Sequence, residues 1–145
     1  MVYWILILGF GPTKAALPIY TAAKLVSVSP TATSPELTRS GQYPLFFHTI
    51  AADDAQANLG ADFAVNKLNA KKIALLHDKG DYGRGYAEFA RDFIKNSGKA
   101  EVVLFEGVTP GAMDYSAVVQ KVQQFDESSV IRKFRITIED RKSVV

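Results

Sequence analysis

The sequence predicts an α/β fold in three layers, a mostly parallel sheet with helices on both faces. Two observations support this prediction. Short apolar runs typical of buried strands alternate with longer segments in which apolar residues recur at helical spacing. The chain has 145 residues, of which 48% are hydrophobic and 22% charged, and this is the size of one domain with a substantial core. An alternation of this kind requires right-handed crossovers between parallel strands.

The first ten residues, MVYWILILGF, are apolar but fewer than the roughly 20 residues that span a bilayer. A secretory signal peptide has positive charge before its apolar run, whereas here the first basic residue, Lys14, follows it. We therefore expect a buried strand over residues 3–8, and no export signal within this chain.

The elements expected up to residue 68 follow from local composition and spacing. In order, they are a Gly-Phe-Gly-Pro turn after the first strand, a helix over 13–23, a strand over 25–29, a loop over 30–41, an extended segment over 44–49 and a helix over 53–68. Pro18 restricts where the first helix can begin. The second helix is expected to bury Leu59, Phe63, Ala64 and Leu68.

The second half continues the alternation with a buried strand over residues 72–77 and another over 101–105. The helix between them has the clearest apolar stripe of the chain: Tyr86, Phe89, Ala90, Phe93 and Ile94. Ser97-Gly98 is expected to end it. Asp114 is predicted to cap a last helix, whose stripe is Tyr115, Val118, Val119, Val122 and Phe125. Residues 131–140 then alternate apolar and charged side chains, as an edge strand does.

Composition excludes several classes of site. The chain has no cysteine and two histidines, so no disulfide, thiolate metal site, histidine-rich metal site or other cofactor is expected. Its net charge is +2, and residues 128–145, with five basic and two acidic side chains, account for more than all of it. No face for nucleic acid is therefore expected.

Ligands of open α/β sheets bind at the carboxyl ends of the strands, where this chain has three loops, over residues 9–13, 30–41 and 78–85. The Gly-x-Gly of the first loop lacks a third glycine, which indicates a tight turn and not a nicotinamide site. The second loop offers hydroxyls and backbone N–H groups that suit a carboxylate. Its hydroxyls could equally cap the turn at residues 36–38, and the residues alone leave both interpretations open.

The third loop begins with His77 and Asp78. An enzyme could use His77 as a base oriented by Asp78, with Ser29 or Ser34 as nucleophile. Adjacent strand residues point to opposite faces, however, and no Gly-x-Ser-x-Gly elbow is present, so catalysis is not expected. Tyr82 could lie over a ligand as an apolar wall, or pack on its own helix.

Five motifs occur in order and at fitting distances: AALPIY at residues 15–20, VSPTATSPEL at 28–37, HDK at 77–79 followed by Tyr82-Gly83, FEG at 105–107 and DYS at 114–116. Together they resemble the branched-chain amino-acid (Leu/Ile/Val) binding proteins of ABC transporters, which have the type I periplasmic-binding fold. The resemblance covers about residues 8–125. It implies two lobes that close on an amino acid, with residues 1–127 as part of the N-terminal ligand-binding lobe.

By the same resemblance, Thr31, Ala32 and Thr33 match the loop that binds the ligand's α-carboxylate and α-ammonium, and Tyr82 matches a tyrosine that covers the ligand. The family usually has a serine where this chain has Phe10. Residues 128–145 resemble nothing in the family and are expected to be an atypical tail, from a shifted reading frame or a truncated chain.

The implied function is a non-enzymatic solute-binding component for a small amino acid or related carboxylate, with an ABC permease as partner and a periplasmic or extracellular location. A ligand-sensing domain of a transcriptional regulator or receptor with the same fold is the alternative. Self-association of a partial lobe is also expected.

Overall fold

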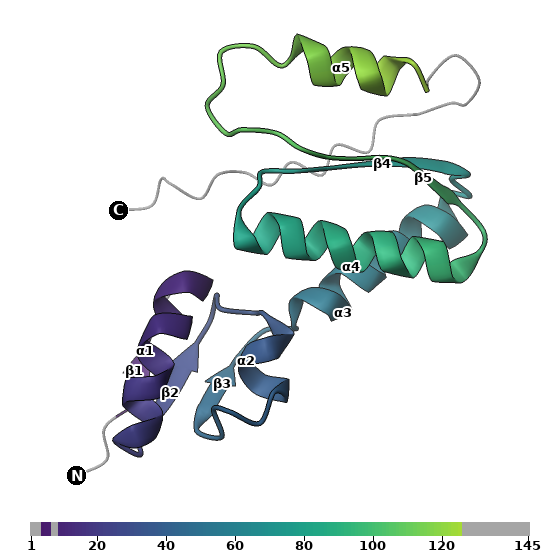
Figure 1. Cartoon of the computed structure of the whole chain (residues 1–145). Coiled ribbons are helices and arrows are strands. Elements are labelled where there is room, and N and C mark those ends of the chain that lie inside the picture. The colour runs from purple at the N-terminus through teal and green to yellow at the C-terminus, as the bar shows by residue number, and fades with distance from the viewer. Residues whose placement is uncertain (1–3, 7–8, 126–145) are drawn as a thin grey trace.

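The computed structural model describes residues 4–6 and 9–125, so the predictions for residues 128–145 and 131–140 lie outside the described part (Figure 1). Strands and helices alternate along the chain as predicted. The strands are β1 (Trp4–Leu6), β2 (Val26–Ser29), β3 (Phe46–His48), β4 (Lys72–His77) and β5 (Glu101–Gly107). The helices are α1 (Phe10–Ala22), α2 (Pro35–Arg39), α3 (Asp53–Asp62) with its π-helical continuation η1 (Phe63–Lys67), α4 (Asp81–Ser97) and α5 (Ser116–Gln123).

All strand pairs of the described residues are parallel, which confirms the predicted pairing. They form two sheets, one with the order β1-β2-β3 and one made of β4 and β5. Within residues 4–6 and 9–125 no ladder joins the two sheets, and the close packing of α3 on α4 connects the two halves instead. The predicted sheet is thus present as two parallel ladders.

Helices cover both faces of the β4–β5 sheet: α4 lies on one face and α5 on the other (Figure 1). The first sheet has α1 against β2 and α2 against β3. The α/β class and its layering therefore agree with the sequence prediction. α4 also ends as predicted, because Gly98 adopts the left-handed conformation (φ 64°) that glycine favours.

Two clusters of buried apolar side chains form the core. One lies between α1, α2 and β3, and it consists of Leu17, Ala32, Leu37 and Phe46. The other lies between α3, η1 and α4, and it consists of Ala57, Ala61, Val65, Ala90 and Ile94. Three of its five members are alanines, whose small side chains let the two helix backbones approach each other closely.

The predicted start of α1 was wrong, because the helix begins at Phe10 and includes the segment that we expected to be a turn. Gly9, with φ 82°, precedes the helix, and its carbonyl accepts hydrogen bonds from the backbone N–H (3.3 Å) and Oγ1 (2.5 Å) of Thr13. Pro12 is tolerated in the first turn, where a backbone N–H has no helical partner. Pro18 lies inside the helix and does not interrupt it.

Two other predicted loops are shorter than expected. Pro35, at the first position of α2, turns part of residues 30–41 into a helix, because proline's fixed φ suits a helix start. Residues 81–85 belong to the first turns of α4, so Tyr82 lies within this helix and not before it.

The predicted apolar stripe of α3 was also wrong. Leu59 is 73% exposed, and Phe63 and Leu68 are exposed too, whereas Ala57, Ala61 and Val65 are buried. The small side chains face α4 because they permit close packing, and the large ones are left outside. α5 likewise buries none of its residues. Its N-cap is Tyr115, one residue later than predicted, although Asp114 Oδ1 does accept the backbone N–H of Ser116 at 2.7 Å.

Candidate functional site

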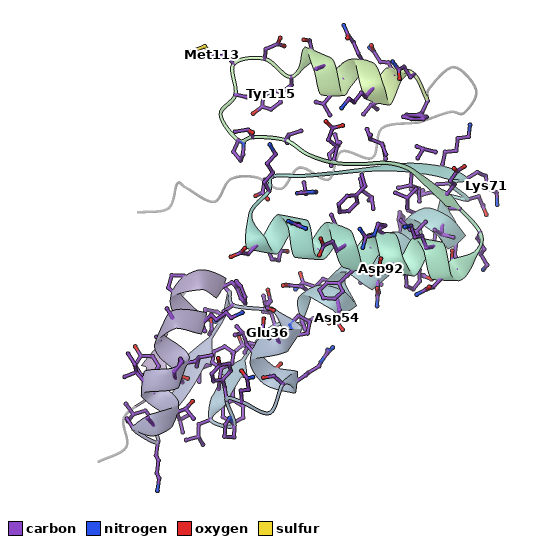
Figure 2. All side chains as sticks on the ribbon, in the orientation of Figure 1. Glu36, Asp54, Lys71, Asp92, Met113 and Tyr115 are labelled. Carbon is purple, nitrogen blue, oxygen red and sulfur yellow. The ribbon has the colours of Figure 1, made fainter. Side chains whose placement is uncertain are left out.

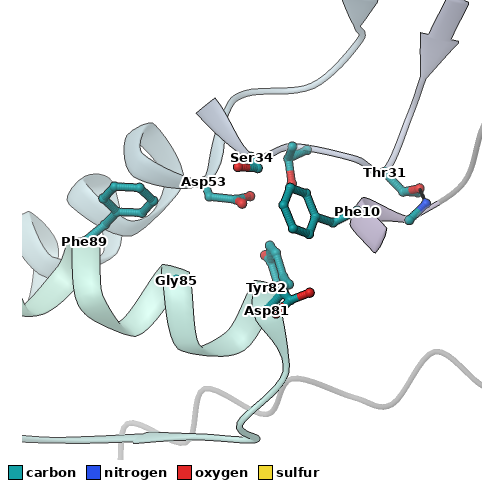
Figure 3. A pocket seen from close by; sticks show the side chains of 10 residues that line it. Phe10, Thr31, Ser34, Asp53, Asp81, Tyr82, Gly85 and Phe89 are labelled. Carbon is teal, nitrogen blue, oxygen red and sulfur yellow. Dashed lines mark hydrogen bonds between the residues drawn. The ribbon is translucent and has the colours of Figure 1, made fainter. Parts of the chain in front are cut away.

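The cavity of interest lies where the three predicted ligand loops meet, between the N-terminal ends of α1, α3 and α4 and the segment after β2 (Figure 3). It has a volume of about 240 Å³. Its lining residues are Gly9, Phe10, Thr31, Thr33, Ser34, Asp53, Asp81, Tyr82, Gly85 and Phe89. All three predicted loops contribute residues to this lining.

Ser29, the buried last residue of β2, organises the wall that follows it. Its Oγ accepts the backbone N–H of Thr31 at 3.2 Å and that of Ala32 at 2.9 Å. The Oγ1 of Thr31 accepts the backbone N–H of Gly9 at 2.9 Å, which joins this loop to the start of α1. The backbone N–H groups of Gly9, Thr31 and Ala32 therefore have acceptors within the chain itself.

Asp53 is the buried charged group of the cavity, with only 5% of its surface exposed. It begins α3, and its backbone N–H donates to the Thr33 carbonyl at 3.0 Å. Its Oδ1 is buried without a hydrogen-bond partner. Burial raises the pKa of this carboxyl, and a hydrogen bond from the Thr33 side chain opposes the rise. In Figure 3 the carboxylate points into the cavity.

Aromatic rings form the other side of the cavity. Phe10 from α1 and Tyr82 from α4 extend toward the same space (Figure 3). Phe89, seven residues after Tyr82 in α4, also lines the cavity. Tyr82 is 40% exposed, and its ring centroid lies 6.0 Å from that of Tyr86 on the same helix. Tyr82 thus combines the two placements considered from the sequence, since it borders the cavity and also neighbours a ring of its own helix.

The residues that the sequence proposed as ligand contacts are only partly brought together. Thr31, Thr33 and Tyr82 line the cavity. Ala32 does not: it is fully buried and belongs to the core cluster with Leu17 and Leu37. Its methyl group fits the core because the neighbouring hydroxyl residues occupy the cavity side.

His77 and Asp78 lie outside the cavity lining and bond to different groups. The Nδ1 of His77 accepts the backbone N–H of Lys79 at 3.1 Å, and Asp78 Oδ1 accepts that of Gly80 at 2.9 Å. This geometry agrees with the expectation that the two side chains do not act as a pair.

The charge of the cavity was not anticipated from the sequence. Its ten lining residues include two carboxylates, Asp53 and Asp81, and no lysine, arginine or histidine. The sequence indicates for Asp53 only a place in the first turn of a helix. The Asp53-Asp54 pair at the start of a helix was the available signal, but nothing in the sequence reports that one of the two is buried. Among the described residues no three potential metal ligands group together.

Among the same residues, no helix is both long and apolar enough to cross a membrane. Figure 2 shows how the side chains of the described residues are distributed over the ribbon.

Comparison with known proteins gives consistent matches. A family model described as periplasmic binding protein matches residues 2–130. The chain is 38% identical over 112 residues to the Leu/Ile/Val-binding protein of Citrobacter freundii, which covers 77% of this chain and 30% of that protein. It is 36% identical over 112 residues to the leucine-specific-binding protein of Salmonella typhimurium, with the same coverage of 77% and 30%. The chain therefore spans about 30% of the length of these relatives.

Solved structures of binding proteins also match this chain. A leucine binding protein from Thermotoga maritima superposes with a TM-score of 0.71 at 23% identity, over 83% of this chain and 34% of that one. A branched-chain amino acid transporter substrate binding protein from Streptococcus pneumoniae, solved with isoleucine, gives a TM-score of 0.65 at 31% identity, over 81% and 33%. The described fold thus corresponds to one portion of a type I periplasmic-binding fold.

Proposed function

The chain belongs to the periplasmic binding protein family, and from this premise we propose that it supplies one wall of a site that captures a small amino acid, of the branched-chain kind, for an ABC permease. The observation that supports this most directly is the cavity. It brings Thr31 and Thr33, from the segment after β2, together with Tyr82 of α4, far from them in the sequence. The relatives named above are called binding proteins for leucine, isoleucine and valine.

The family consists of binding proteins, so the chain is not an enzyme. We propose a periplasmic or extracellular location, as the family name implies. We also propose that residues 1–127 are part of an N-terminal ligand-binding lobe and that residues 128–145 are not. The family match over residues 2–130 supports a boundary close to this position.

The affinity of the chain on its own should be low. Ligand sites typically bury 70–90% of a small ligand, whereas here Tyr82 and Asp81 remain exposed at the edge of the cavity. We expect dissociation constants for leucine, isoleucine and valine in the millimolar range.

Saturation-transfer NMR on the full chain tests the proposal with these three amino acids, and glucose serves as a non-binding reference. Tyr82→Ala should weaken the transfer, because it removes a wall of the cavity. Tyr115→Ala is a matched control: Tyr115 is 39% exposed, close to the 40% of Tyr82, and lies outside the cavity lining. No transfer to any amino acid, or equal transfer in all three proteins, would contradict the proposal.

A further inference from the structure

We propose that the outward side of α3 and η1 is a contact surface for a second copy of this chain, in which the two helices pack antiparallel about a two-fold axis. The surface consists of Leu59, Phe63 and Leu68, with the charged residues Asp62 and Lys67 beside them. None of these five residues lines the cavity, so the inference does not depend on the proposed function.

The exposure of large apolar side chains on one side of this helix is the first argument. Leu59 is 73% exposed, Phe63 44% and Leu68 48%. The other side of the helix, which includes Ala61 and Val65, is buried against α4. Soluble monomeric proteins rarely expose contiguous apolar patches, and larger ones mark surfaces that bind a partner.

The π-helical turn η1 is the second argument, because it aligns the apolar residues. The backbone N–H of Leu68 donates to the carbonyl of Phe63 at 3.0 Å, a hydrogen bond that spans five residues. In such a turn, residues five apart lie about one turn apart, on the same side of the helix. In an α-helix with 3.6 residues per turn they would be about 1.4 turns apart, and Leu68 would point away from Phe63. π-helical turns are rare and frequently occur at functional sites.

The third argument is a row of polar side chains along one flank of the apolar residues. Asp62 Oδ1 accepts a hydrogen bond from Asn66 Nδ2 at 2.7 Å, and Asn66 Oδ1 accepts one from Lys99 Nζ at 2.7 Å. Lys67 is exposed beside this row. The row is therefore acidic at the end near Leu59 and basic at its other end.

This order of charge makes the surface complementary to itself. A two-fold axis perpendicular to the helix reverses its direction but keeps each flank on its own side. The acidic start of the row in one copy then lies against the basic end of the row in the other, and this occurs twice in a symmetric dimer. Parallel helices would instead bring like charges together. A second copy of the chain is thus the occupant that the charges favour.

The size of the surface sets the strength of the dimer. Stable interfaces bury roughly 20–30 residues on each side, whereas this surface is one face of a single helix, so we expect a dissociation constant on the order of 0.1 mM.

Sedimentation equilibrium of the full chain at low ionic strength, with charge reversals, tests the arrangement. Asp62→Lys alone, or Lys67→Glu alone, places like charges at both contacts and should weaken the dimer by about threefold or more. An equimolar mixture of the two variants should restore it, because their heterodimer has opposite charges at both contacts. A mixture that associates no better than either variant alone would overturn the inference. Stronger association of either variant with wild type than with itself and with the other variant would indicate parallel helices, and would also overturn it.

Leu68→Lys tests the part of the surface that the π-helical turn supplies. It should weaken the dimer by about tenfold or more. Met113→Lys is the control, because Met113 is fully exposed but lies in the loop between β5 and α5, and it should leave the dimer unchanged. Equal effects of the two substitutions would contradict the inference. If Leu68→Lys does not fold, the mixture of charge variants decides.

The same measurement distinguishes other occupants of the surface. If the full chain stays monomeric at millimolar concentration and a chain that ends at residue 127 dimerises, residues 128–145 cover the surface and the inference is wrong. If both chains stay monomeric, the inference is also wrong.

Discussion

At the scale of single residues, the neighbouring carboxylates Asp53 and Asp54 of α3 behave in opposite ways. Burial raises the pKa of Asp53 above the ordinary value of 3.8, and the adjacent charge of Asp54 adds to the rise. A hydrogen bond from the Arg39 side chain lowers the pKa of Asp54 below 3.8. One ionised group therefore opposes folding, and the other supports it.

The two carboxylates should give opposite pH dependences of stability. Because the folded-state pKa of Asp53 is raised, the folded protein binds more protons there, and its stability falls as the pH rises through 3.8 toward that raised pKa. Asp53→Asn removes this cost, so its unfolding free energy should increase relative to wild type between about pH 3.5 and 7. The unfolding free energy of Asp54→Asn should be lower than that of wild type over the same range, because the variant loses a stabilising contribution that is present above pH 3.8. Urea unfolding across this pH range measures both, and parallel curves would contradict the assignment.

The start of α4 depends on a glycine. Asp78 Oδ1 accepts the backbone N–H of Gly80, and a Cβ atom at Gly83 would overlap that same carboxylate. Gly83→Ala should therefore destabilise the protein by about 1–3 kcal/mol. Gly85→Ala is the matched control in the same helix, where a Cβ meets no atom within 4 Å. It should stabilise by about 0.5–1 kcal/mol. Chemical denaturation of both variants tests this, and equal effects would contradict it.

At the scale of elements, the contact between α3 and α4 depends on small residues. Ala61 is buried in the cluster with Ile94, whereas Leu59, two residues earlier, is exposed. Ala61→Leu should overpack this contact and cost about 1–3 kcal/mol. Leu59→Ala should change the unfolding free energy by less than about 0.5 kcal/mol. Thermal and urea unfolding would show it, and a larger loss for Leu59→Ala would mean that the helix faces α4 with its other side.

The same helices explain how far the sequence could predict the fold. α4 was predicted well because its large apolar residues repeat at helical spacing and a glycine ends it. α3 was assigned the wrong face because alanine gives a weak periodic signal, while Leu59 and Phe63 give a strong one. The first turn of α1 was missed because glycine and proline are usually read as a turn.

The cavity, like the fold, could be predicted only in part. Its position followed from topology, since ligand loops lie at the carboxyl ends of parallel strands. The burial of Asp53 and the position of Phe10 beside the cavity did not follow, because burial and the direction of a side chain depend on tertiary packing. Ala32 illustrates the same limit: it lies in the matched loop but faces the core.

At the scale of the whole molecule, both core clusters and the cavity are built from residues 9–94. We therefore expect a chain that ends at residue 127 to keep the thermal midpoint of the full chain within a few degrees. Differential scanning calorimetry of the two chains measures this. A fall of more than about 4 °C, which corresponds to roughly 1 kcal/mol for a domain near this size, would show that residues 128–145 belong to the fold.

The described surface also exposes large apolar side chains, and these favour self-association. Leu59 and Phe63 lie four residues apart along the outward side of α3 and η1, and Ile19 of α1 is 68% exposed. We expect sedimentation velocity to show dimers or larger species as concentration rises. Leu59→Lys should reduce them by placing charge in the apolar surface. Thr31→Lys is the control, because contacts through the ligand loop are not expected. A clean monomer over a wide concentration range would count against this prediction, and a stronger effect of Thr31→Lys would move the contact to the cavity.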